Sequence, residues 1–152
     1  MDTRCRRNGQ MKNNEGKKLE GFTVIRKLGI FFGLAFLLGG IFGFVPGVTK
    51  DGMYFGMFMV NTPHNLLHIA SGAIFLIASR LGARPARLWF QSFGVIYAAI
   101  SIIGFGVGDG KIFGLISNNQ CDSWGHAVLA LMLLVIGFAS SKKPAPSESS
   151  LV

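Results

Sequence analysis

The chain has 152 residues, of which 50% are hydrophobic and only 14% are charged. A water-soluble domain normally carries about 25% charged residues, so this composition excludes an ordinary soluble domain. The length allows one domain, and the missing charge is what a lipid-facing surface requires.

The net charge of +8 comes from basic residues that gather in a few segments. Eight of the fifteen Lys and Arg residues precede Leu28, and three lie between residues 80 and 87. Neither a basic helix nor an aromatic platform accompanies this charge, so we do not expect nucleic-acid binding. The expected partner of the basic residues is the anionic headgroup layer of a lipid bilayer.

Four apolar segments follow a polar, basic start. Residues 1–22 have no hydrophobic period and are predicted to form a disordered cytoplasmic tail. Residues 23–140 are predicted to form an all-α domain of four transmembrane helices, with spans at about 28–45, 63–79, 88–107 and 122–139. Residues 141–152 are predicted to be a second disordered tail. Because a span needs about 20 residues, the second and fourth reach that length only if their polar first residues are helical.

The basic residues also predict the orientation. All but two of them precede the first span, follow the fourth or lie between the second and third, whereas Lys50 and Lys111 lie in the other two loops. The positive-inside rule then places both termini in the cytoplasm. Cys5 and Cys121 would lie on opposite sides of the bilayer, as two free thiols. The predicted location is the cytoplasmic membrane, as a multi-pass protein.

The second half of the domain repeats the first at an offset of 58 residues. Matches of Asp, Asn and His are informative in a chain with so few polar residues. The matched pairs are Asp51 and Asp109, Gly52 and Gly110, Phe55 and Phe113, Gly56 and Gly114, Asn61 and Asn119, and His68 and His126. The predicted fold is therefore two tandem helix pairs, related by a pseudo-two-fold axis along the membrane normal.

Polar residues are concentrated where the second and fourth spans begin, on the outer side. Thr62 is predicted to be an N-cap, with Pro63 as the first helical residue. His64 and His68 are four residues apart and so share one helix face. Asp122 and His126 have the same spacing at the fourth span. All three histidines of the chain thus fall in one layer.

These two segments resemble motifs of a bacterial family of small four-helix membrane proteins of unknown function. The family pattern N-x-x-H-N-x-x-H is matched by Asn61, His64, Asn65 and His68. Its second pattern, D-N-x-x-H, is matched by Asp122 and His126, with Ser123 in place of the second residue. The resemblance covers about residues 28 to 140. It implies the fold and the membrane location, and it carries no established activity.

The cluster supports two kinds of function. In the first, the polar residues form a clasp that satisfies the free amides of the helix starts and holds the two helix pairs together. His64, His68, Asp122 and His126 are its central residues, and Asn61, Asn65, Asn119 and Ser123 would support them. This interpretation predicts a non-enzymatic membrane protein without a cofactor, and it leaves open a second copy or another membrane protein as partner.

The second kind of function is ligand binding at the same residues. Three imidazoles and one carboxylate suit zinc or another transition metal, and His68 with His126 could instead be the axial ligands of a haem. A role as an accessory to small-molecule or ion transport is a further alternative, because short spans at matching positions of two repeats occur at transporter substrate sites.

Overall fold

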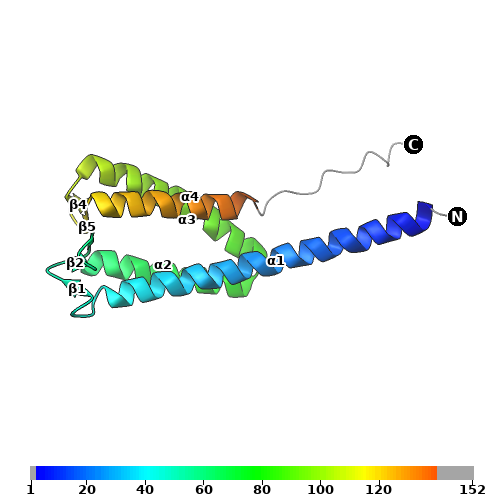
Figure 1. Ribbon diagram of the computed structural model, residues 1–152, viewed down its shortest axis with the longest axis horizontal. Coiled ribbons are helices and arrows are strands. Elements are labelled where there is room, and N and C mark those ends of the chain that lie inside the picture. Colours follow the sequence, from blue (N-terminus) through cyan, green and yellow to red (C-terminus); the bar gives the residue numbers. More distant parts are fainter. Residues whose placement is uncertain (1–2, 140–152) are drawn as a thin grey trace.

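The computed structural model describes residues 3–139 and contains four helices and five short strands (Figure 1). The helices are α1 (Thr3–Phe42), α2 (Thr62–Leu81), α3 (Ala83–Val107) and α4 (Gln120–Ala139). All the strands lie at one end of the bundle, and the start of α1 and the end of α4 lie toward the other end (Figure 1). The residues at positions 1–2 and the predicted tail 141–152 lie outside the described residues.

Helix α1 corrects the prediction of a disordered segment at residues 1–22, because it begins at Thr3. The segment contains no proline and several good helix formers, including Arg, Lys, Glu, Gln and Met. Extending an existing helix is far easier than nucleating one, so the apolar part of α1 supplies the nucleus from which these polar turns continue.

Three helical segments of the described chain are long and apolar enough to cross a membrane. They are Thr23–Phe42, Ala83–Val107 and Gln120–Ala139. Helix α2 also has 20 residues, and its polar first turns lower its mean hydropathy. The polar starts of the second and fourth predicted spans are indeed helical, as the length argument required.

The basic segment between α2 and α3 is helical rather than a loop. Gly82 alone separates the two helices, with a φ of 141° that favours glycine. Arg80 therefore lies in the last turn of α2, where a cation interacts favourably with the helix dipole.

The two connections at the other end fold into small antiparallel sheets that the sequence did not predict. The first contains β1 (Thr49–Lys50), β2 (Met53–Tyr54) and β3 (Phe58–Met59), and the second contains β4 (Gly110–Ile112) and β5 (Ile116–Asn118). Each sheet has a three-residue hairpin loop that begins with Phe-Gly, and both of these residues have positive φ: Phe55-Gly56 and Phe113-Gly114. Such turns match the natural twist of a hairpin.

The most extensive helix contacts join α1 to α2 and α3 to α4. An aromatic core fills the space between these two pairs. Phe32 of α1 lies edge-on to Phe90 of α3 at 5.6 Å between ring centroids, and Phe75 of α2 lies 5.0 Å from Phe90. Phe75 and Phe90 are fully buried. The core thus fixes the two pairs side by side and brings the starts of α2 and α4 together beneath the hairpins.

A candidate histidine site beneath the two hairpins

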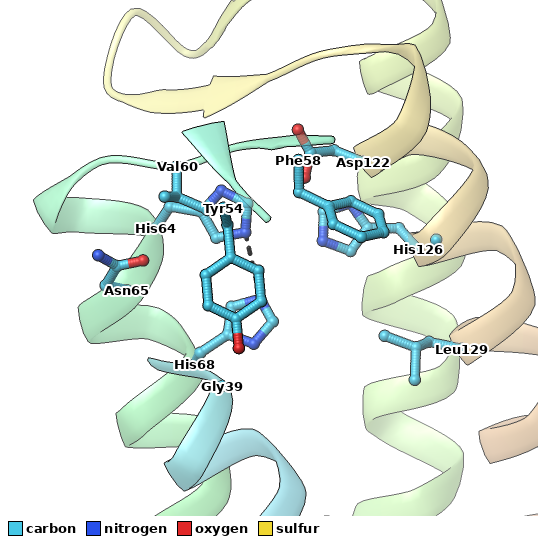
Figure 2. A pocket seen from close by; sticks show the side chains of 11 residues that line it. Gly39, Tyr54, Phe58, Val60, His64, Asn65, His68, Asp122, His126 and Leu129 are labelled. Carbon is cyan, nitrogen blue, oxygen red and sulfur yellow. Dashed lines mark hydrogen bonds between the residues drawn. The ribbon is translucent and has the colours of Figure 1, made fainter. Parts of the chain in front are cut away.

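A cavity of about 260 Å³ lies between the starts of α2 and α4 (Figure 2). Apolar side chains from the first sheet and from α4 form much of its wall, and the polar groups are concentrated at the two helix starts. Its lining includes Tyr54, Phe58, Val60, His64, Asn65, His68, Asp122, His126 and Leu129. The structure therefore places all four predicted central residues around one space.

The two helix starts use asparagine as the N-cap. Asn61 Oδ1 accepts a hydrogen bond from the backbone N–H of His64 at 3.1 Å, which corrects the prediction of Thr62 as the cap. At α4, Asn119 Oδ1 accepts from the N–H of Asp122, and Asp122 Oδ2 accepts from the N–H of Asn119, both at 2.9 Å. This reciprocal pair is equivalent to a capping box.

Each cap asparagine also bonds to the opposite half of the molecule. Asn61 Nδ2 donates to the carbonyl of Leu115 in the second hairpin at 2.7 Å. Asn119 Nδ2 donates to the carbonyl of Met57 in the first hairpin at 2.8 Å. The two donor residues are 58 residues apart, and so are the two acceptor residues. The two bonds are therefore equivalent under the sequence repeat.

A second pair of bonds crosses between the halves in the same way. His64 Nδ1 lies 3.0 Å from the carbonyl oxygen of Ser117, and Asp122 Oδ2 accepts from the backbone N–H of Met59 at 2.8 Å. His64 and Asp122 are 58 residues apart, and so are their partners Met59 and Ser117. The repeat thus uses a histidine at this position in one half and an aspartate in the other. From here on, the name clasp means the four side chains that make these crossing bonds: Asn61, His64, Asn119 and Asp122. His68 and His126, predicted from the sequence to be among its central residues, make none of them.

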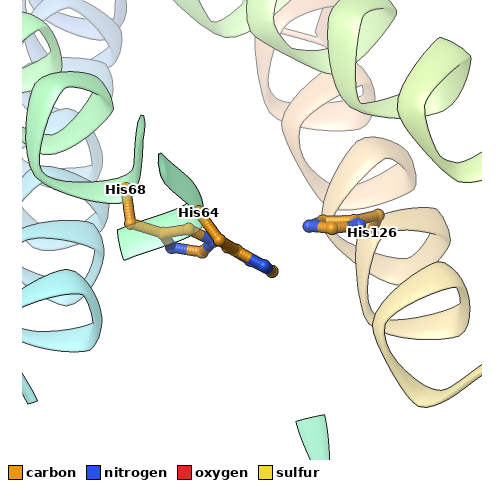
Figure 3. Close-up of side chains that lie close together, drawn as sticks. All are labelled: His64, His68 and His126. Carbon is orange, nitrogen blue, oxygen red and sulfur yellow. The ribbon is translucent and has the colours of Figure 1, made fainter. Parts of the chain in front are cut away.

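The three histidines converge between α2 and α4 (Figure 3). His64 Nε2 lies 3.2 Å from His68 Nε2, as the helical spacing of four residues predicts. His126 comes from α4 on the opposite wall, and its ring centroid lies 5.8 Å from that of His64. One ring nitrogen of each histidine lies within 4.8 Å of the other two.

The hydrogen bonds fix the tautomer of His64. A backbone carbonyl can only accept, so His64 Nδ1 carries the proton that it donates to Ser117. In the neutral ring, Nε2 is then an acceptor, and in the metal-free protein it accepts from His68 Nε2–H at 3.2 Å. His126 differs, because its Nδ1 is buried and has no hydrogen-bond partner among the described residues.

Residues 26–139 match a domain of unknown function, DUF4383. The chain belongs to this family. The resemblance inferred from the two histidine motifs is thereby confirmed at the level of the family. No curated protein and no solved structure matches the chain.

In this DUF4383 domain the predicted supporting residues have different roles. Asn61 and Asn119 belong to the clasp, whereas Ser123 Oγ donates to the carbonyl of Asn119 at 3.1 Å. The Asn65 side chain packs against Gly43, the residue that follows α1, and a Cβ added to Gly40 of α1 would lie 2.6 Å from the Asn65 carbonyl oxygen. Asn65 thus joins α2 to α1 rather than to α4.

Sequence reasoning missed Asn118 and the hairpin carbonyls. Asn118 is fully buried, and its Nδ2 donates to the carbonyls of Gly104 and Gly108 at 3.2 and 2.9 Å. These bonds tie the end of α3 to β5, and Asn118 Nδ2 also donates to Ser123 Oγ of α4 at 3.2 Å. Asn118 pairs with Val60 in the repeat, so the repeat could not reveal it, although a second asparagine beside Asn119 was a visible signal.

Tyr54 belongs to the hairpin that covers the cavity. Partial burial raises the pKa of its hydroxyl above the ordinary value of 10.0. The phenol therefore keeps its proton at neutral pH and can donate a hydrogen bond into the cavity.

Proposed function

We propose that this DUF4383 protein is a non-enzymatic, multi-pass protein of the cytoplasmic membrane whose outer clasp holds two helix pairs together. All four helices would cross the bilayer, with both termini in the cytoplasm. The observation that carries the proposal is the set of four reciprocal hydrogen bonds between the halves.

The length and packing of α2 support a fourth crossing. Its 20 residues span about 30 Å, the thickness of the hydrocarbon core. It packs closely against α1, and its polar residues His64, Asn65 and Ser71 are buried. Intramembrane polar groups normally face the bundle interior in this way.

The geometry of the outer end supports the tandem repeat. The matching Phe-Gly turns, the matching asparagine caps and the crossing bonds all occur at equivalent positions of the two halves. A pseudo-two-fold axis between α2 and α4 accounts for all three.

The clasp solves a problem that the bilayer imposes. The first backbone N–H groups of a helix have no partner within it, and an unsatisfied group in a water-poor environment is costly. The carbonyls and amides of the two hairpins face the same difficulty. Exchanging these bonds between the halves satisfies both helix starts and both hairpins, and it makes the outer end one unit.

Replacing Asn119 with alanine tests the clasp. Asn119→Ala removes the bond to Met57 and the cap of α4, so we expect the free energy of unfolding in detergent to fall by about 1–3 kcal/mol for the buried groups left unpaired. Thermal unfolding of metal-free protein, followed by circular dichroism, measures the change.

The matched control is Gln120→Ala. Gln120 is the next residue and is exposed, and its backbone N–H rather than its side chain bonds to Asp109. This variant should unfold close to the wild-type midpoint. Equal midpoints for Asn119→Ala and the wild type would refute the clasp.

A further inference from the structure

We propose that His64, His68 and His126 bind one divalent transition-metal ion, with its fourth coordination position open to the cavity. This inference goes beyond the clasp, because it concerns ring nitrogens that make no crossing bond. His64 belongs to both arrangements, through Nδ1 in the clasp and through Nε2 in the metal site.

The distances between the nitrogens suit a tetrahedral ion. Metal–imidazole bonds of about 2.0–2.1 Å at tetrahedral angles place two ligand nitrogens roughly 3.3 Å apart. His64 Nε2 and His68 Nε2 already lie 3.2 Å apart. The nitrogen of His126 completes a set in which every pair lies within 4.8 Å, and binding an ion would require it to move closer to the other two.

The surroundings of His64 are those of a metal ligand. Histidine ligands commonly donate their other ring N–H to a carbonyl or carboxylate, which fixes the ring and directs the remaining lone pair at the ion. The carbonyl of Ser117 plays this part for His64 Nδ1. The second hairpin therefore orients a ligand that α2 supplies.

Hydrogen bonds account for both nitrogens of His64 and for Nε2 of His68, but not for His126. The crossing bonds of the clasp use neither His68 nor His126, and a ring nitrogen of His126 is buried without a partner among the described residues. A buried polar atom of this kind calls for an explanation such as an ion. A metal ion bound between the three rings would bring His126 into a shared set of interactions with His64 and His68.

The donor set also narrows the ligand. Imidazole suits zinc, copper, nickel and iron, and three histidines with an open fourth position is a ligand count found in catalytic zinc sites. Asp122 Oδ2 is engaged by two backbone N–H groups, so we do not assign the carboxylate as a ligand. A haem fits poorly, because His64 lies 3.2 Å from the His68 nitrogen, where a porphyrin ring would have to extend.

Zinc and cobalt binding by the full chain in detergent tests the site. The protein is purified without a polyhistidine tag, treated with a chelator, loaded with Zn²⁺ or Co²⁺ and desalted before metal analysis. We expect one ion per chain and, with Co²⁺, the visible absorption of a tetrahedral nitrogen site. His68→Gln and His126→Gln should each weaken binding by more than the roughly 10- to 100-fold that loss of an outer-shell partner causes.

Cys121→Ser is the matched control. Cys121 is an exposed thiol at the same end of the bundle and would bind zinc non-specifically. The serine variant should retain the full stoichiometry. Absence of retained metal in the wild type, or unchanged binding in both histidine variants, would overturn the proposal.

X-ray absorption of zinc-loaded wild-type protein supports or refutes the site without any variant. Several imidazole nitrogens at about 2.0–2.1 Å are expected, and a shell containing sulfur would refute it. The outcome is separate from that of the clasp, because Asn119→Ala is measured in metal-free protein and leaves the three histidines in place.

Discussion

At the scale of single residues, the end of the bundle that carries the strands is arranged in two layers that share His64. The upper layer consists of asparagine, aspartate and histidine side chains bonded to the opposite hairpin. The lower layer consists of imidazole nitrogens that face one another. Phe36 and Tyr97 close the lower layer from below, with ring centroids 5.4 Å from His68 and 5.2 Å from His126.

Asp122 is the carboxylate on which the upper layer depends. Its Oδ2 accepts from the N–H groups of Met59 and Asn119, one in each half. Asp122→Ala leaves two backbone donors without an acceptor, and each costs about 1–3 kcal/mol when buried. Asp122→Asn keeps an acceptor oxygen and loses only the charge. We therefore expect it to be less stable than the wild type and more stable than Asp122→Ala. Thermal unfolding in detergent ranks the two variants.

Asp109→Ala is the comparison for this series. Asp109 Oδ1 also accepts a bond at the start of α4, from Gln120 N–H at 3.3 Å, but the residue is exposed. Water can replace that bond, so the change should stay within about 0.5 kcal/mol. An alanine effect at Asp109 as large as that at Asp122 would contradict the distinction between them.

Much of the site could be predicted at this scale, although not the division of roles. The rarity of polar residues pointed to the three histidines, Asp122 and the repeat-related asparagines. The choice of Thr62 over Asn61 as N-cap was wrong because both are good caps and one residue separates them. The two-layer arrangement could not be predicted, because it depends on the hairpin carbonyls of Met57, Leu115 and Ser117, which no sequence pattern marks.

At the scale of elements, the helix pairs are held by close backbone approach. A Cβ added to Gly72 of α2 would lie 2.6 Å from the carbonyl oxygen of Gly33 and 2.6 Å from the amide nitrogen of Leu37, both in α1. Small residues at such contacts are the usual means of packing helices in lipid. Gly94 of α3 approaches Leu134 of α4 in the same way, because a Cβ added to Gly94 would lie 2.7 Å from the Leu134 side chain.

Gly72→Val should therefore separate α1 from α2. The added methyl groups meet main-chain atoms that cannot rotate away, and overpacking of this kind costs about 1–3 kcal/mol. Gly106→Val provides the control, because a Cβ at this glycine of α3 meets nothing within 4 Å. The unfolding midpoint should fall for the first variant and remain near that of the wild type for the second. Equal shifts would mean that the close contact is not needed.

The elements that escaped prediction are those that depend on their neighbours. The long apolar segments of the sequence predicted the positions of all four helices. The strands have only two or three residues each, too short for an alternating pattern. Their positions depend on turns such as Asp51-Gly52 and Phe113-Gly114, of which only the Asp-Gly dipeptide is a recognised hairpin signal.

At the scale of the whole molecule, the two ends differ in character. The end with the strands carries the clasp and the cavity, whereas Arg80, Arg84 and Arg87 lie at the turn between α2 and α3, away from the strands (Figure 1). If α2 crosses the bilayer with the other three helices, these arginines face the cytoplasm. The orientation then decides from which compartment a metal ion could enter the cavity.

The two natural cysteines can test this orientation without foreign reporters. Cys121 is exposed at the strand end, and Cys5 precedes the first span. In intact cells, a membrane-impermeant maleimide should label the Cys5→Ser variant, through Cys121, and should label the Cys121→Ser variant only after the membrane is permeabilised.

Introduced cysteines test the crossing of α2. Lys50→Cys, placed in the Cys5→Ser, Cys121→Ser background, should be labelled from outside, because both hairpins lie at one end. Arg84→Cys in the same background should be protected, since α2 must cross for the two positions to differ. Labelling of Arg84→Cys in intact cells would show that α2 does not span the membrane as proposed.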